Sequence, residues 1–187
     1  KAMAADWAAL MDHLGVERTN LFGYSMGSRT SVEAALRAPQ RFSNLILGGV
    51  GGGWLDPRQE PAERTGMSMA EAMLAEDPET INPEMLKSFR QFADEQGEDR
   101  KALAAFIAAK NPPVDAAALG GLNIPALVVA GQFDALAKEP ERLAAAFAHG
   151  KSMVLPGCDH FSAIPHVSLK GAVFDFLDGL LEDDGFE

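Results

Sequence analysis

The distribution of apolar residues predicts short buried strands that alternate with helices. Apolar side chains recur at helical spacing over residues 3–14, and a short apolar run at 21–22 follows them. Residues 29–38 suit a helix that ends before Pro39, and the apolar run 45–47 is typical of a buried strand. A strand, helix, strand order favours parallel strands. We therefore expect an α/β fold with a mostly parallel sheet flanked by helices.

The middle of the chain has a different pattern. From 54 to about 119 the sequence shows helical periodicity and no strand signal. Ser68 and Glu71 form a capping-box pattern, and Asn82 before Pro83 is typical of an N-cap followed by the first helical position. A block of short helices between two strands suggests an inserted helical cap rather than another layer of the core.

The α/β pattern resumes in the last third of the chain. An apolar strand covers 124–130, a second short strand covers 152–155, and a periodic apolar helix follows near the end. We therefore assign residues 1–53 and 120–187 to the α/β core and residues 54–119 to the helical cap. The glycine-rich segment 48–53 lacks the lysine of a phosphate-binding loop, and we interpret it as a flexible hinge.

Composition narrows the possible functions. The chain has 187 residues, of which 47% are hydrophobic, enough for one sizeable core. A formal net charge of -11 repels phosphate backbones and anionic lipid, so we expect no nucleic-acid partner and no membrane partner. No apolar run approaches the length of a membrane span. The single cysteine, Cys158, excludes an internal disulfide framework and favours a reducing compartment such as the cytoplasm.

The motif Gly23-Tyr24-Ser25-Met26-Gly27 is the main chemical signal. It fits the G-x-S-x-G pattern, lying between an apolar run and a helix-compatible segment. The tight turn strains the central residue. We expect positions 23 and 27 to require small residues, because strand and helix pass close together there, and Gly23 and Gly27 meet that requirement. Ser25 would then expose its hydroxyl at a helix N-terminus, which favours developing negative charge. An ordinary turn serine is the alternative.

A serine hydroxyl needs a base, and the base needs a carboxylate to orient it. Asp134 and His160 follow the two later strands, and functional groups collect at the carboxyl ends of parallel strands. The three candidates occur in the chain order Ser, Asp, His, and this order distinguishes them from serine triads whose residues follow another order. The alternatives are a turn or N-cap role for Asp134, and His166 as the base, although we expect His166 at the start of the last helix.

Two neighbours of His160 receive structural interpretations. Asp159 precedes the histidine directly, so its side chain points elsewhere and cannot easily orient the imidazole. Cys158 has no metal-ligand spacing around it, and we expect a small buried apolar side chain.

The chain resembles the α/β-hydrolase fold family through three motifs: residues 23–27, residues 129–134 and residues 157–161. The resemblance implies that Ser25 is the nucleophile, His160 the general base and Asp134 the residue that orients it. It also implies that the backbone N–H of Met26 is one oxyanion-hole donor. No metal and no organic cofactor are expected.

The resemblance implies a serine hydrolase that cleaves a small to medium ester, thioester or lactone-like substrate through an acyl-enzyme. A serine in place of an aspartate nucleophile argues against haloalkane dehalogenase and epoxide hydrolase chemistry. The alternatives on the same triad are carbon–carbon bond hydrolysis and cofactor-free perhydrolysis. A non-catalytic ligand-binding member of the fold is the alternative from another class.

In this family, strands precede the elbow, and a loop after one of them supplies the second oxyanion donor. Nothing in this chain corresponds to them, so we expect the C-terminal part of a longer hydrolase. That protein would be represented only in part, or cleaved, with a separate N-terminal fragment as a partner. The strand with Leu21 and Phe22 would then form an apolar edge of the sheet.

Overall fold

The computed structural model describes residues 2–57, 66–109 and 112–181. The chain forms two compact units, a core unit of Lys1–Asp56 with Pro113–Glu187 and a helical unit of Pro57–Pro112. The elements of the core unit are α1 (Ala2–His13), β1 (Thr19–Tyr24), α2 (Met26–Arg37), η1 (Pro39–Arg41), β2 (Phe42–Gly48), η2 (Gly52–Leu55), α6 (Ala116–Gly120), β3 (Ala126–Gly131), α7 (Pro140–Ala144), β4 (Gly150–Leu155) and α8 (Val167–Leu177). The helical unit contains α3 (Met69–Leu74), η4 (Pro78–Thr80), α4 (Glu84–Glu95) and α5 (Arg100–Ala108).

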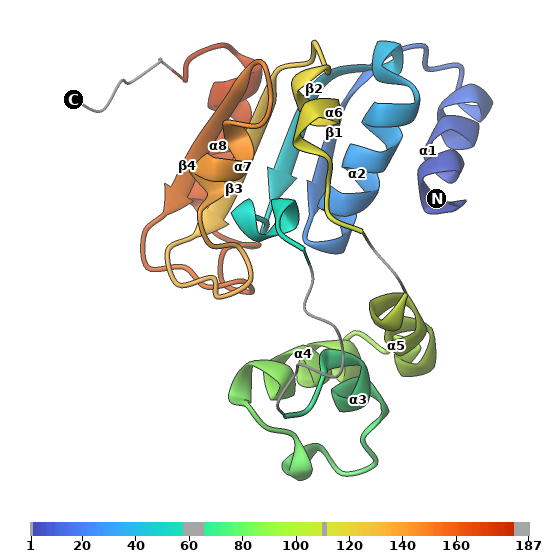
Figure 1. Cartoon of the computed structure of the whole chain (residues 1–187), viewed down its shortest axis with the longest axis vertical. Coiled ribbons are helices and arrows are strands. Elements are labelled where there is room, and N and C mark those ends of the chain that lie inside the picture. Colours follow the sequence, from blue (N-terminus) through green and yellow to red (C-terminus); the bar gives the residue numbers. More distant parts are fainter. Residues whose placement is uncertain (1, 58–65, 110–111, 182–187) are drawn as a thin grey trace. The chain divides into compact units, whose positions relative to one another are not determined.

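The core unit is built on a parallel four-stranded sheet in the order β1-β2-β3-β4 (Figure 1). The register places Leu47 of β2 between Gly23 of β1 and Val128 of β3. All four strands therefore end at the same edge of the sheet. This arrangement confirms the predicted α/β class and brings the loops that follow β1, β3 and β4 to one side.

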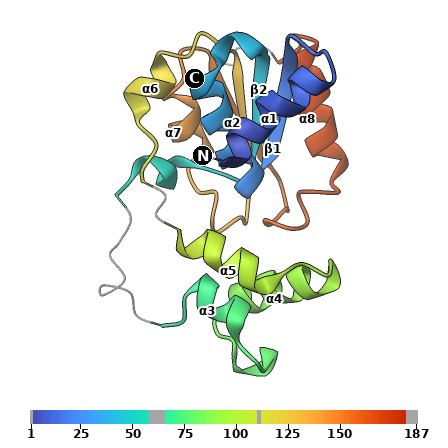
Figure 2. The same cartoon turned by 90° about the vertical axis from the view of Figure 1, so that its right-hand side faces the viewer.

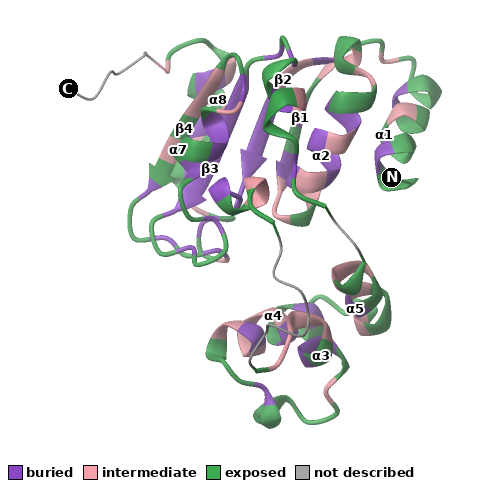
Figure 3. Cartoon of the chain, viewed as in Figure 1, coloured by how far each residue is buried: buried purple, intermediate pink, exposed green. Residues whose placement is uncertain are grey.

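Alternate residues of the central strands point to opposite faces of the sheet, as the period of two requires. Leu45 and Leu47 of β2 pack with α1, α2, α6 and α7, whereas Ile46 packs on the other face with α8. Within the core unit, Figure 2 shows α8 on one side of the sheet and α2, α6 and α7 on the opposite side. β3 is buried at all six positions, and Figure 3 shows the buried residues gathered along the strands. Burial on both faces explains the continuous apolar run of this strand.

β1 lies at one edge of the sheet. Within the described residues it pairs only with β2. Leu21 is buried under the helices, but Phe22 points to the α8 face and is 45% exposed. α8 packs against β3 and β4, and Phe22 stays partly exposed at the edge. The expected apolar edge is thus confirmed.

The helical unit confirms one of its two predicted helix starts. Ser68 Oγ accepts a hydrogen bond from the N–H of Glu71, whose carboxylate accepts from the N–H of Ser68. The prediction for Asn82 and Pro83 is wrong by one residue, because Pro83 has extended backbone angles (φ -78, ψ 172) and is itself the N-cap of α4. The interpretation of this unit as a cap stays a prediction.

A buried arginine joins two helices of the helical unit. Arg90 of α4 is only 4% exposed, and its guanidinium donates to the carbonyl oxygen of Ala75 at 2.6 Å and to Asp94 at 2.9 Å. Ala75 is the C-cap of α3, where carbonyl groups lack partners within the helix. Arg90 therefore ties the end of α3 to α4.

The boundaries of the inserted segment lie inside the predicted range of 54–119. Trp54 and Leu55 pack against the main cluster of the core unit. Val114 and Leu119 are buried in that cluster. These apolar contacts assign η2 and α6 to the core unit, so the helical unit begins at Pro57 and ends at Pro112.

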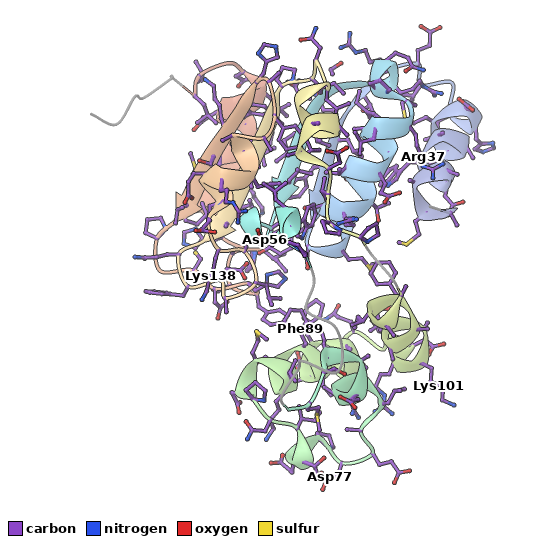
Figure 4. The ribbon with its side chains drawn as sticks, viewed as in Figure 1. Arg37, Asp56, Asp77, Phe89, Lys101 and Lys138 are labelled. Carbon is purple, nitrogen blue, oxygen red and sulfur yellow. The ribbon has the colours of Figure 1, made fainter. Side chains whose placement is uncertain are left out.

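The prediction of a flexible hinge at 48–53 is wrong. The N–H of Gly52 donates to the carbonyl oxygen of Lys138 at 2.9 Å, and a Cβ on Gly51 would lie 2.0 Å from that same oxygen. The glycines are present because two backbone segments touch here. Figure 4 labels Lys138 and Asp56 in this region. Asp56 accepts two hydrogen bonds from Arg142 at 2.8 and 2.6 Å, which fixes the end of η2.

No helix in the described parts of the chain is both long enough and apolar enough to cross a membrane.

Candidate active site

Ser25 sits at the junction of β1 and α2. Its backbone angles are φ 51 and ψ -111, a conformation that L-residues rarely adopt. The N–H of Ser25 donates to the carbonyl oxygen of Gly48 at 2.8 Å, which holds the turn against the end of β2. The strained turn predicted for this motif is therefore present. Ser25 is the N-cap residue of α2, yet its side chain makes no capping hydrogen bond.

The two glycines of the motif have different roles. A Cβ on Gly23 would lie 2.4 Å from the carbonyl carbon of Gly27, so any side chain on Gly23 would collide with the backbone of α2. A Cβ on Gly27 would meet nothing within 4 Å. The expected size limit is confirmed for Gly23 and wrong for Gly27. The approach involves the backbone of Gly27 and not the space where its side chain would stand.

Asp134 and His160 form a buried pair. His160 Nδ1 lies 2.7 Å from Asp134 Oδ2, and the side chains are 9% and 0% exposed. The other carboxylate oxygen of Asp134 accepts from the N–H of Leu136 at 2.9 Å. Both oxygens of the carboxylate are thus engaged, which fixes its orientation. A carboxylate on Nδ1 leaves Nε2 as the ring nitrogen that can accept a proton.

The imidazole lies beside the end of β2, the strand that holds the turn of Ser25 through Gly48. A Cβ on Gly49 would be 3.1 Å from His160 Cε1, the carbon between the two ring nitrogens. Gly49 directly follows Gly48, the residue that accepts the hydrogen bond from the Ser25 N–H. The loops after β1, β2, β3 and β4 therefore bring the three predicted residues to one edge of the sheet.

The rival residues occupy other positions. His166 is the N-cap of α8 and accepts from the N–H of Ser168, as predicted. Asp159 Oδ1 accepts from the N–H groups of Phe161 and Ser162. Hydrogen bonds from Ser162 lower the pKa of Asp159 despite a small opposing effect of burial, so this exposed carboxylate stays ionised and holds its own turn. Cys158 is buried in the α8 cluster, which confirms its interpretation as a small apolar side chain.

The amide groups at the start of α2 favour negative charge. Met26 is the first residue of α2, and the first N–H groups of a helix have no carbonyl partner within it. Its amide directly follows Ser25, as an oxyanion donor requires. Among the described residues, no group of three or more His, Cys, Asp or Glu is arranged to hold a metal ion.

Two residues at this edge were not identified from the sequence. The Ser28 hydroxyl is buried and lies 2.8 Å from the carbonyl oxygens of both Gly23 and Gly48, so it joins α2 to the ends of two strands. The Tyr24 hydroxyl donates to the carbonyl oxygen of His160 at 2.7 Å. A polar residue in the first helical turn and a phenol beside the serine are the only sequence signals, and neither indicates its distant partner.

Comparisons with known proteins agree with the fold of the core unit. A sequence profile described as the alpha/beta hydrolase fold matches residues 1–103. The chain is 31% identical over 162 residues to the dihydrolipoyllysine-residue acetyltransferase component of the acetoin cleaving system of Pseudomonas putida. The aligned region covers 81% of this chain and 43% of that protein. It is 27% identical over 188 aligned residues to 2-hydroxy-6-oxononadienedioate/2-hydroxy-6-oxononatrienedioate hydrolase 2 of Pseudomonas putida. That alignment covers 90% of this chain and 65% of that protein.

A solved structure extends the likeness. A thermophilic esterase from Thermogutta terrifontis, with malate bound, has a TM-score of 0.68 and 25% sequence identity over 96% of this chain and 72% of its own. The chain spans less than two thirds of the length of the two curated relatives. The profile match over more than half of the residues shows that the chain belongs to the alpha/beta hydrolase fold family.

Proposed function

We propose that the protein is a serine hydrolase that cleaves a small to medium ester, thioester or lactone through an acyl-enzyme. The observation that carries the proposal is the buried Asp134–His160 pair, with 2.7 Å between Oδ2 and Nδ1, at the sheet edge where the strained elbow holds Ser25. A buried carboxylate on imidazole Nδ1 is the arrangement that activates a serine.

The proposed reaction has two steps. Ser25 Oγ attacks the carbonyl carbon while His160 Nε2 takes the hydroxyl proton, and the same proton then passes to the departing alcohol or thiol. Asp134 stabilises the imidazolium, and the N–H of Met26 donates to the oxyanion. Water, activated by His160, then hydrolyses the acyl-enzyme and frees Ser25.

Apolar side chains next to the three residues support an apolar substrate. Met26 follows the serine and is 40% exposed, and Phe133 precedes the aspartate and is 66% exposed. Phe161 follows the histidine and stacks edge-on against its ring, with centroids 5.6 Å apart. We therefore propose an apolar acyl group or leaving group, since exposed apolar surface at a reactive centre gains from being covered.

Carbon–carbon bond hydrolysis on the same residues is the second candidate. The likeness to the Pseudomonas putida protein named as a 2-hydroxy-6-oxononadienedioate hydrolase favours it. Fold alone does not separate the two reactions, because the substrate contacts select between them.

The test is turnover of p-nitrophenyl esters of increasing acyl length and, in parallel, of 2-hydroxy-6-oxononadienedioate, followed by its dienol absorbance. The proposal predicts ester hydrolysis that Ser25→Ala abolishes. Ser168→Ala is the matched control, because it removes an exposed hydroxyl of α8, and it should keep wild-type rates. Turnover of the dienedioate alone would favour the second candidate. No turnover of either substrate would support a ligand-binding role.

A further inference from the structure

We propose that Tyr24 is a positioning residue, which holds the loop that carries His160 at a fixed place relative to Ser25. This inference rests on the proposed function, because it concerns how the same three residues are aligned. Tyr24 precedes Ser25 directly in the chain, and its hydroxyl reaches a residue 136 positions away. One side chain therefore connects the turn of the nucleophile to the loop of the base.

The contact to His160 has two parts. Tyr24 Oη donates a hydrogen bond to the His160 carbonyl oxygen at 2.7 Å. The two rings are also in contact in a tilted arrangement, with centroids 5.4 Å apart and planes inclined by 55°. His160 is thus held at both ends, by Asp134 on its ring nitrogen and by Tyr24 on its backbone. A side chain fixed only through Nδ1 could still move with its loop.

Two glycines fix the path of the tyrosine ring across the end of β2. A Cβ on Gly48 would lie 2.5 Å from Tyr24 Cδ2, and a Cβ on Gly49 would lie 2.8 Å from its Cε1 and Cζ. The ring fits only because both positions lack a side chain. Gly48 also accepts the hydrogen bond from the Ser25 N–H, so one residue contacts both the nucleophile's backbone and the tyrosine.

The donor keeps its proton at neutral pH. Burial, and after it the charge of Asp134, raises the pKa of Tyr24 above its ordinary value of 10.0. The phenol is therefore neutral, as a donor to a carbonyl oxygen must be.

The principal test compares Tyr24→Phe with wild type. Phenylalanine keeps the ring and loses one hydrogen bond, so we expect kcat to fall roughly three- to tenfold with KM unchanged. Gly48→Ala should lower kcat also, because its Cβ displaces the ring. Gly53→Ala is the matched control, since a Cβ there meets nothing within 4 Å, and it should keep wild-type kcat. Circular dichroism confirms that each variant is folded.

The His160→Ala background separates positioning from general stabilisation. If Tyr24 acts through His160, Tyr24→Phe lowers the residual kcat/KM of His160→Ala no further. An equal additional loss in that background would overturn the inference, as would an unchanged kcat of folded Tyr24→Phe in the active enzyme. An inactive wild type that also fails to react with a fluorophosphonate would overturn the proposed function itself. These results are distinguishable.

Discussion

Replacing Asp134 with asparagine tests the role of the buried pair. One carboxylate oxygen of Asp134 accepts from the N–H of Leu136 at 2.9 Å, and the other lies 2.7 Å from His160 Nδ1. In Asp134→Asn, the Leu136 N–H keeps the amide oxygen on its side, so the amide NH2 turns toward the imidazole. His160 Nδ1 must then accept a hydrogen bond, and Nε2 carries the proton. A protonated Nε2 cannot take the proton of Ser25.

The expected loss follows from this tautomer change. In a serine protease triad the same substitution lowers kcat about 10⁴-fold, which corresponds to about 5.4 kcal/mol of activation free energy. The shape of the side chain is preserved, so the fold should persist. The assay is kcat for a p-nitrophenyl ester, with urea denaturation to compare the stability of variant and wild type.

Asp159→Asn is the matched control for this substitution. Asp159 neighbours His160 in the chain, but it is exposed and binds its own turn through Oδ1, which asparagine retains. We expect its kcat to stay close to wild type. A folded Asp134→Asn that keeps more than about a tenth of wild-type kcat, where about 10⁻⁴ is expected, would refute the reasoning. So would a large loss confined to Asp159→Asn.

Three further predictions concern stability, measured by urea denaturation. Gly23→Ala should lose about 1–3 kcal/mol, because its Cβ would overlap the α2 backbone, whereas Gly27→Ala should lose nothing. Ser28→Ala should lose about 1–3 kcal/mol, because the carbonyl groups of two strands lose a buried donor. The raised pKa of Tyr24, the only tyrosine, means that its contribution is complete below pH 10.0 and is lost at higher pH. The stability of wild type should therefore fall toward that of Tyr24→Phe above pH 10.0, and an unchanged difference would contradict this.

The sequence predicted the centre of the sheet well because β3 is buried on both faces. A continuous apolar run such as β3 needs no knowledge of distant residues. The glycine-rich segment 48–53 could not be interpreted from the sequence, because its conformation depends on a residue that is distant in the chain. Composition does not distinguish a glycine that allows movement from one that allows contact, and here the contact is with Lys138. The limits of the helical unit also depend on packing. An apolar residue such as Trp54 or Leu119 has the same sequence signal whether it packs in a cap or in the core, and here both pack in the core.

Chain order predicted which residues lie near one another, while their catalytic roles stay a prediction. Parallel strands bring their carboxyl ends together, so the positions of Ser25, Asp134 and His160 after strand ends predicted that they share one edge. The hydrogen bond between the aspartate and the histidine agrees with the assigned order. The hydrogen bonds of Tyr24 and Ser28 could not be predicted, because each goes to a backbone carbonyl oxygen that only the fold brings near.

Covalent labelling tests the central claim most directly. The protein is treated with a fluorophosphonate, digested, and its adduct located by peptide mass spectrometry. The proposed mechanism predicts one adduct, on Ser25, which is absent in Ser25→Ala and forms far more slowly in His160→Ala. An adduct on another residue that persists in Ser25→Ala, or the absence of any adduct on the folded protein, would contradict the assignment of Ser25 as the nucleophile.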